Sequence, residues 1–407
     1  MIAASAVALA WLCPLAAAAA PAPPYAVLLR QAQGQGPRLG ESAANVRAAK
    51  GMAEQAGARP NPVVGLDVED IGRRDQTGIP QRQSTLSVSQ AFELGGKRAA
   101  RTDAGRADLS TAAARDRQAQ ADFAYDLANA YAVAEAAQRR VALLADDRAR
   151  AREDLRATRA LVDAGRQAGL RALQAQAAAT AADAEFQAAR ADAAEAMARL
   201  SALVGAPEPF SSIDVSLLNA AASLRGAPAQ LPAGAPAVAV AQAEREAAVR
   251  RIRVERTRAI PDITLRVGAR RYEDNGDTAL MAGVSAPLPL FDRNRGAVAA
   301  ATAQLSAAEA RLNGARLEAE AEWRAAAAQT SAGDVRLDAA VEGEAATREA
   351  YRLTRIGYEA GRTSLLELSA ARRALVEAQT RLVEVQLARI RAEAVLARLA
   401  GRIPFGD

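Results

Sequence analysis

Two parts of the chain hold paired segments in which apolar and polar residues alternate. The first pair covers residues 64–69 and 86–92, and the second covers residues 263–268 and 280–288. A period of two is typical of strands with one apolar and one polar face. Polar, turn-rich residues separate the members of each pair, so the pattern predicts two β-hairpins. Each arm has about 9 to 11 residues, the length of a tilted strand that crosses a bilayer.

Helices flank both predicted hairpins. A helix over residues 25–58 precedes the first hairpin and a helix over residues 237–259 precedes the second, and both end at prolines, which cannot continue a helix. A proline-free helix follows each hairpin, over residues 97–162 and 293–358. At about 1.5 Å per residue each is roughly 100 Å long, which exceeds the diameter of a compact domain.

Glycine-containing turns end both long helices. After the turns at residues 163–166 and 359–362, returning helices follow over residues 170–204 and 365–400. Leucines spaced seven residues apart in the second returning helix indicate coiled-coil packing. The sequence therefore predicts two long αα-hairpins.

The same unit occurs twice. Identical residues recur 196 positions later: Val88-Ser89 as Val284-Ser285, Gly165-Arg166 as Gly361-Arg362, Leu170 as Leu366, and Gly205 as Gly401. A fixed offset of this kind indicates an internal duplication. We expect a signal peptide over residues 1–20, a first repeat over 21–205, a proline-rich equatorial linker over 206–236, a second repeat over 237–401, and a C-terminal tail over 402–407.

The signal peptide is indicated by an apolar run that ends in small residues. Cleavage after Ala20 and cleavage after Ala18 are both open. Lipidation of Cys13 is a third alternative, although the residues before it lack the small side chain that the processing enzyme prefers.

Composition narrows the function. Alanine dominates the apolar half of the chain, which suits thin helices that approach closely. The 52 basic and 47 acidic residues alternate in sign along the helices, which indicates a solvated surface and no nucleic-acid partner. The chain has no histidine and a single cysteine, so it lacks the usual general base and the commonest metal ligands. We expect no enzyme, no cofactor and no metal site.

Four membrane-length strands cannot close a barrel alone, because an open sheet edge is not tolerated in lipid. Copies of the chain must pool their strands. Two copies would give about eight strands and a filled interior, whereas three would give about twelve strands and a wider lumen.

Three segments are distinctive: residues 86–98 (LSVSQAFELGGKR), 287–296 (PLPLFDRNRG) and 357–368 (GYEAGRTSLLEL). Together with the order of helix, strand pair, long helix and returning helix, which occurs twice, they resemble the TolC family of outer-membrane efflux factors. The resemblance extends over about residues 25–405. The ELGGKR run resembles the CzcC-like branch, which serves heavy-metal pumps of the resistance-nodulation-division (RND) class.

This resemblance implies an α+β, mainly α fold. A homotrimer would form a 12-stranded transmembrane β-barrel in the outer membrane of a Gram-negative bacterium, continued by a long periplasmic α-helical barrel. It also implies passive conduction of substrate, with heavy-metal cations expected. The implied partners are a periplasmic membrane-fusion adaptor and an inner-membrane RND pump.

The resemblance assigns the helix-reversing turns to the periplasmic tip that the adaptor contacts. The expected contact residues are Gly165, Arg166, Leu170, Gly361, Arg362, Ser364 and Leu366. The glycines also have a purely structural role as helix terminators. Glu367 has two interpretations, an acidic ring at the channel entrance or a solvated carboxylate on a helix.

Basic residues follow both hairpins: Lys97, Arg98, Arg293 and Arg295. They are expected near lipid head groups, and ordinary helix-surface charge is the alternative. Gly95-Gly96-Lys97 is no phosphate-binding loop, because Arg98 stands where that motif needs serine or threonine. The competing function is a periplasmic coiled-coil scaffold or adaptor that does not span the membrane.

Overall fold

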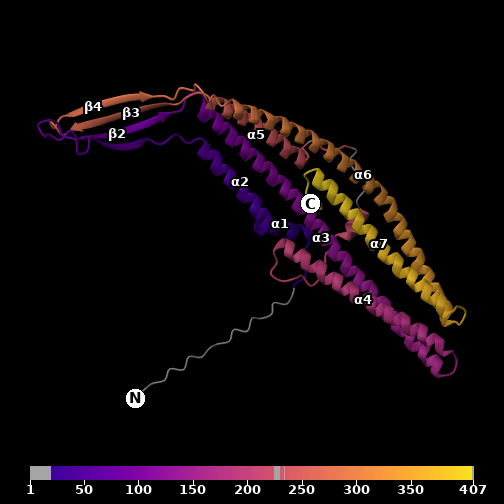
Figure 1. Cartoon of the computed structure of the whole chain (residues 1–407). Helices are drawn as coiled ribbons and strands as arrows, with labels where there is room; N and C mark the ends of the chain where they lie inside the picture. The colour runs from indigo at the N-terminus through magenta and orange to yellow at the C-terminus, as the bar shows by residue number, and fades with distance from the viewer. Residues whose placement is uncertain (1–19, 224–229, 233, 406–407) are drawn as a thin grey trace, which may run out of the picture.

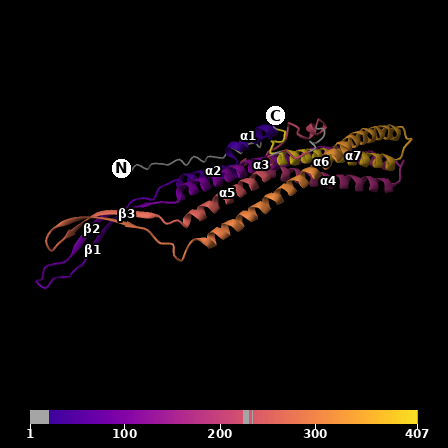
Figure 2. The same cartoon turned by 90° about the horizontal axis from the view of Figure 1, so that it is seen from above.

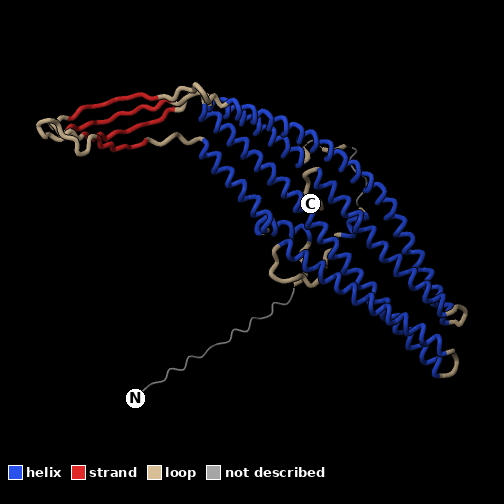
Figure 3. The backbone as a smooth tube through the Cα atoms, in the orientation of Figure 1, coloured by secondary structure: helices blue, strands red, loops and turns tan. Residues whose placement is uncertain are grey.

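The chain forms an elongated molecule with a small sheet at one end and long helices running away from it (Figures 1 and 3). The computed structural model describes residues 20–223, 230–232 and 234–405. Apart from Ala20, the predicted signal peptide lies outside these residues, as does the end of the C-terminal tail. Among the helices of the described part, none is long and apolar enough to cross a membrane.

The sheet has four antiparallel strands. They are β1 (Val63–Glu69), β2 (Gln83–Phe92), β3 (Ile263–Tyr272) and β4 (Thr278–Ser285), and their order in the sheet is β1-β2-β3-β4. Both predicted hairpins are therefore confirmed, although β1 with 7 residues and β4 with 8 are shorter than the expected length of about 9 to 11 residues. They join side by side through β2 and β3, which come from different repeats.

The first repeat contains four helices. They are α1 (Tyr25–Gln35), α2 (Pro37–Ala56), α3 (Lys97–Asp163) and α4 (Gly169–Val204). The prediction of a single helix over residues 25–58 is wrong. Gly36 adopts extended backbone at φ −67° and ψ 128°, and Pro37 begins a new helix at the position where its missing N–H costs least.

The second repeat contains three helices in the part of the chain that the structure describes. Its helices are α5 (Pro236–Arg258), α6 (Arg295–Glu359) and α7 (Leu365–Leu399). The long helix begins two residues later than predicted, because Asn294 is left-handed at φ 55° and occupies the N-cap. Between the repeats the described residues include one short 3-10 helix, η1 (Leu218–Ala222).

The main apolar core lies halfway along α3, far from both ends of the molecule. The Tyr25 ring packs edge-on against Tyr131 and Phe405, with ring centres 6.4 and 6.2 Å apart. The Tyr131 hydroxyl donates to the carbonyl of Val215 at 2.7 Å. This core gathers the start of the described chain, α3, the linker and the C-terminal segment around one level of the helical body.

A buried carboxylate fastens the linker to α3. Glu135 is only 3 % exposed and accepts hydrogen bonds from the Leu217 N–H at 2.7 Å, the Leu218 N–H at 3.0 Å and the Ser216 hydroxyl at 2.5 Å. Arg139 forms an ion pair with the same carboxylate at 2.8 Å. All acceptor positions of this buried charge are used, so its desolvation is compensated.

Candidate functional site

The sheet has one apolar and one polar face, as its alternating sequence predicts. Strand register places Val64, Val88 and Val267 in one row of the same face, and Leu66, Leu86 and Ala269 in the next. The large apolar side chains of this face are exposed, up to 90 % for Leu280. An extended apolar face without a covering layer is suited to lipid.

The opposite face carries charged and small polar side chains. On this face Arg270 of β3 reaches across β2 to the Glu69 carboxylate at 3.3 Å and donates to the Thr85 hydroxyl at 2.9 Å. Arg266 of β3 and Asp67 of β1 lie on the same face, and their side chains make no hydrogen bond or ion pair within the described part of the chain.

The outer strands β1 and β4 are each paired on one side only within the described sheet. Their other edges expose unpaired backbone N–H and C=O groups, which lipid cannot satisfy. The sheet is therefore an incomplete element by itself.

The joint between β2 and α3 is closed by contacts within the chain. The Lys97 ammonium pairs with Asp262 at 2.7 Å, and the Leu94 N–H donates to the same carboxylate at 3.2 Å. Arg98 donates to the carbonyl of Gly57 at 2.6 Å. Two of the four predicted membrane-edge cations are thus engaged in holding the strand-to-helix joint.

The joint between β4 and α6 is tied to α5 by Asn294, whose side-chain amide donates to the Glu255 carbonyl at 2.8 Å and to the Glu255 carboxylate at 2.9 Å, but its apolar side chains are uncovered. The guanidinium of Arg293 donates to the carbonyl of Pro289 at 3.4 Å, and Arg295 is exposed as the first residue of α6. Leu290 and Phe291 project from this joint, and Phe291 is 100 % exposed. The two repeats therefore differ at the same structural position.

The turns predicted as the periplasmic tip lie at the end of the molecule opposite the sheet (Figure 2). Gly165 and Gly361 have φ values of 69° and 70°. In each turn the glycine N–H and the next N–H bond back to the last turn of the helix, with Arg166 donating to Leu161 and Arg362 donating to Gly357. This is the Schellman termination, and it holds both tips in one conformation.

Apolar side chains project from both tips. Leu170 at the start of α4 is 65 % exposed and Leu366 at the start of α7 is 74 % exposed. The structure thus places the predicted adaptor-contact residues together at one end, and the predicted membrane-edge residues at the other.

Ser364 and Glu367 form a capping box at the start of α7. The Glu367 N–H donates to the Ser364 hydroxyl at 3.2 Å, and the Ser364 N–H donates to the Glu367 carboxylate at 2.6 Å. These hydrogen bonds lower the pKa of Glu367. This capping role was not among the predictions for Glu367, although serine followed by glutamate three residues later is the recognised signal.

A buried arginine links the two helical hairpins near the tip. Arg372 of α7 is 4 % exposed and lies 3.4 Å from Asp147 and 3.6 Å from Asp154, both on α3. Burial raises the pKa of Asp154, while the Arg372 charge opposes that shift. No sequence signal marked Arg372, because arginines occur throughout these helices.

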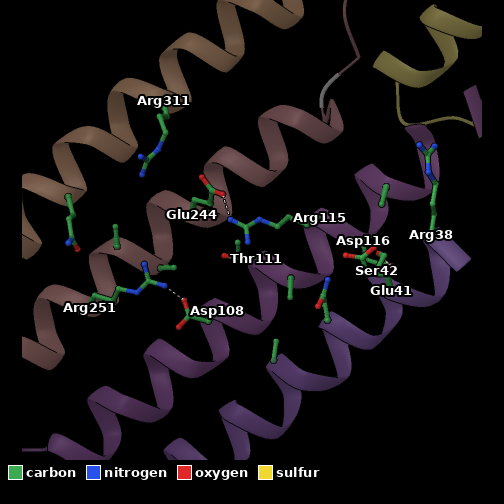
Figure 4. Close-up of a pocket in the computed structure, with 17 residues that line it drawn as sticks. Arg38, Glu41, Ser42, Asp108, Thr111, Arg115, Asp116, Glu244, Arg251 and Arg311 are labelled. Atoms are coloured by element: carbon green, nitrogen blue, oxygen red, sulfur yellow. Dashed lines mark hydrogen bonds and ion pairs between the residues drawn. The ribbon is translucent and has the colours of Figure 1, made fainter. Parts of the chain in front are cut away.

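A polar groove of about 1170 Å³ runs between α2, α3, α5 and α6 (Figure 4). Arg115 pairs with Glu244 at 2.5 Å and Arg251 pairs with Asp108 at 2.7 Å across the helices. These charges hold neighbouring helices together. Within the described residues, no group of three or more His, Cys, Asp or Glu side chains could hold a metal ion.

A lipid-suited sheet with unpaired edges, continued by helices about 100 Å long, defines a membrane-embedded conduit subunit. The chain belongs to the outer membrane efflux protein family, whose model matches residues 28–206 and 227–402. It is accordingly an outer-membrane efflux channel component, and the periplasmic scaffold that does not span the membrane is set aside.

Relatives within this family are metal-resistance proteins. The nickel-cobalt-cadmium resistance protein NccC of Alcaligenes xylosoxydans xylosoxydans is 46% identical over 96% of this chain and 89% of its own length. The nickel and cobalt resistance protein CnrC of Cupriavidus metallidurans is 48% identical over 98% of this chain and 95% of its own length. The cobalt-zinc-cadmium resistance protein CzcC of the same organism is 28% identical over 92% of this chain and 89% of its own length.

Solved structures share the fold. The outer membrane protein VceC of Vibrio cholerae superposes with a TM-score of 0.76 at 22% identity, covering 93% of this chain and 96% of that one. CusC, a transmembrane channel protein, gives a TM-score of 0.78 at 16% identity over 93% of this chain and 92% of that one. The TolC-type fold predicted from sequence is confirmed.

Proposed function

We propose that three copies of this chain close a 12-stranded barrel in the outer membrane and pass substrate through it without consuming energy. The observation that carries this proposal is the sheet, whose apolar face is exposed and whose two edges are unpaired. Three copies pool about twelve strands, enough for an open lumen, whereas two give a barrel filled by side chains. Residues 21–205 and 237–401 would each supply one hairpin, joined by the linker over 206–236.

The helical hairpins extend the lumen into the periplasm. We infer that a membrane-fusion adaptor contacts their tips at Gly165, Arg166, Leu170, Gly361, Arg362, Ser364 and Leu366, and that an energised inner-membrane RND pump drives transport. The exposed leucines at the tips offer apolar anchors for such a partner. Glu367 would then stand near the channel entrance, where three copies form an acidic ring.

At the other end, Lys97, Arg98, Arg293 and Arg295 would lie close to the lipid head groups. Arg293 and Arg295 are exposed for this role, whereas Lys97 and Arg98 also secure the first joint.

The cargo is proposed to be divalent nickel, cobalt and cadmium ions, because NccC and CnrC carry resistance to these metals in their names. Deletion of the gene should sensitise the host to nickel, cobalt and cadmium. If deletion sensitised the host to uncharged drugs and left its sensitivity to the three metals unchanged, the proposed cargo would be contradicted. The proposal that the protein is a channel would still stand.

The native mass of the detergent-extracted protein tests the assembly. A mass of three chains in an outer-membrane extract is expected. A stable monomer or dimer would contradict the proposed barrel.

A further inference from the structure

Two opposite charges on the polar face of the sheet have no ion-pair partner among the described residues. Arg266 lies on β3, next to the outer strand β4, and Asp67 lies on the other outer strand, β1. Both are exposed, and the β4 residue that pairs with Arg266 is Gly283, which has open space where a side chain would be. In a ring of copies, β4 of one chain meets β1 of the next.

The internal repeat supplies the register of that missing contact. Ser89 of β2 recurs as Ser285 of β4, 196 residues later, and these serines pair with Val63 and Thr264 respectively. Val63 of β1 therefore corresponds to Thr264 of β3, 201 residues later. The same offset superposes Pro60 on Pro261, at the ends of the preceding helices, which supports the correspondence.

The β2–β3 contact, where the first repeat meets the second, is the template. It pairs Ser87 with Gly268. Ser87 of β2 corresponds to Gly283 of β4, 196 residues later, and Gly268 of β3 corresponds to Asp67 of β1, 201 residues earlier. The equivalent pair between two copies is therefore Gly283 with Asp67. In both versions one member is glycine. A Cβ on Gly268 would lie only 3.0 Å from the Ser87 Cβ, whereas nothing lies within 4 Å of Gly283 in this chain. Gly283 would therefore leave the room that Asp67 of the partner subunit needs.

The alternation of side chains checks this register independently. The template pairs Leu86–Ala269 and Val88–Val267 become Ala282–Val68 and Val284–Leu66. All four residues lie on the apolar face of the sheet, as they must if the face continues across the contact. A slip by one residue would set apolar against polar side chains.

From this register we infer that β4 pairs with β1 of a second copy, and that Arg266 reaches over Gly283 to form an ion pair with Asp67 of the partner subunit. The span is two strand spacings, about 9.6 Å between backbones. Arg270 already bridges the same number of strands to Glu69 within the chain, at 3.3 Å. The inference rests on the proposed trimer and adds its register and its charge pair.

The uncovered apolar side chains at the joint between β4 and α6 are consistent with the same contact between copies. In the first repeat the joint packs on the segment before β3, where Asp262 binds Lys97 and Gly95 touches Ile260. The corresponding segment for the second joint is residues 59–62 of the partner subunit. Contact there would cover Leu290 and Phe291, which this chain leaves exposed.

Cysteine pairs in the full-length protein test the register. The chain's single cysteine is Cys13, so the unmodified protein is a low-background parent. Ala282→Cys combined with Val68→Cys should oxidise to reducible dimers and trimers as the majority product. Ala282→Cys with Leu66→Cys, two residues out of register, should give several-fold less. Leu86→Cys with Ala269→Cys, the template pair inside one chain, is the positive control for oxidation.

The outcomes distinguish a wrong strand register from a wrong oligomeric state. Stronger cross-linking of the out-of-register pair, or none from either pair while the control oxidises in a trimer of normal mass, overturns the register and leaves the trimer standing. A monomeric mass overturns both the trimer and the inference.

Charge reversal tests the ion pair. Asp67→Arg and Arg266→Asp should each lower the temperature at which the trimer dissociates in detergent, and the double variant should recover most of that loss. Single variants that match the parent, or a double variant no better than the singles, would overturn the pair even if the cysteine register holds.

Discussion

At the scale of single residues, the molecule depends on a few positions where backbone shape or buried charge leaves little choice. Gly165 and Gly361 hold positive φ values at the hairpin tips with open space around them. Glycine is needed there for its backbone freedom alone, because no neighbouring atom would clash with a side chain. These two positions could be predicted from sequence, since glycine at a helix end is a local signal.

Gly361→Ala should therefore destabilise the second tip by about 1 kcal/mol, because alanine pays for the left-handed backbone. The matched control is Gly343→Ala on the exposed face of α6, which should stabilise by about 0.5 to 1 kcal/mol through helix propensity. Urea midpoints of the purified trimer compare the two. Equal shifts of the same sign would contradict the strained turn.

Glu135→Ala should destabilise the protein by about 3 kcal/mol, because the N–H groups of Leu217 and Leu218 lose their buried acceptor. Glu195→Ala is the control, since its ion pair with Arg199 is exposed and should contribute less than about 0.5 kcal/mol. Thermal denaturation measured by circular dichroism separates them. Similar small losses would show that the linker is held by other contacts.

Glu135 and Arg372 could not be identified from the sequence. Each is one of many glutamates or arginines on helices, and only the packing of segments distant in the chain buries it. Their partners lie on the linker and on the other helical hairpin. A local sequence pattern carries no information about such long-range contacts.

At the scale of elements, the hydrophobic period of the sequence predicts the strands and helices correctly, whereas the ends of the helices are predicted less well. Both β-hairpins and both long helical hairpins follow from alternation and from helix-reversing glycines. The break between α1 and α2 does not follow from the helix predicted over residues 25–58, which runs through the Gly36-Pro37 pair. The start of α6 at Arg295 was likewise not predicted, because a left-handed asparagine at an N-cap has no distinctive sequence pattern.

The link between the two helical hairpins leads to a prediction about opening. Arg372→Ala should loosen the contact of α7 with α3, because it removes the shared counter-charge of Asp147 and Asp154 at a cost of about 3 kcal/mol. Amide hydrogen exchange should quicken near both tips. The neighbouring exposed Arg373→Ala should leave exchange unchanged, and equal effects of the two variants would contradict a specific link.

The same contact should depend on pH through Asp154. Burial raises the pKa of Asp154 when the hairpins are packed, so the packed arrangement binds a proton more tightly than separated hairpins do. Acidification from neutral pH toward the raised pKa, above the ordinary 3.8, should therefore favour packing and raise the protection factors of the tip amides, in which the intrinsic pH dependence of exchange is divided out. Asp154→Asn should lose this part of the pH dependence, and an unchanged slope would refute the assignment.

At the scale of the whole molecule, the internal repeat sets the polarity: both β-hairpins lie at one end and both glycine turns at the other. Strand length, strand count and the family together define an outer-membrane channel. The particular cargo could not be predicted from the residues, since a wide lumen needs no selective ligands, and it enters through the relatives NccC and CnrC.

Conductance across a planar lipid bilayer tests the conduit most directly. Purified trimers of the parent and of Arg372→Ala would be added from the same side at matched concentration. We expect discrete conductance steps, larger or more frequent for Arg372→Ala because its tips are less tightly held. Inserted trimers that leave both bilayers at the background conductance of lipid alone would contradict the conduit.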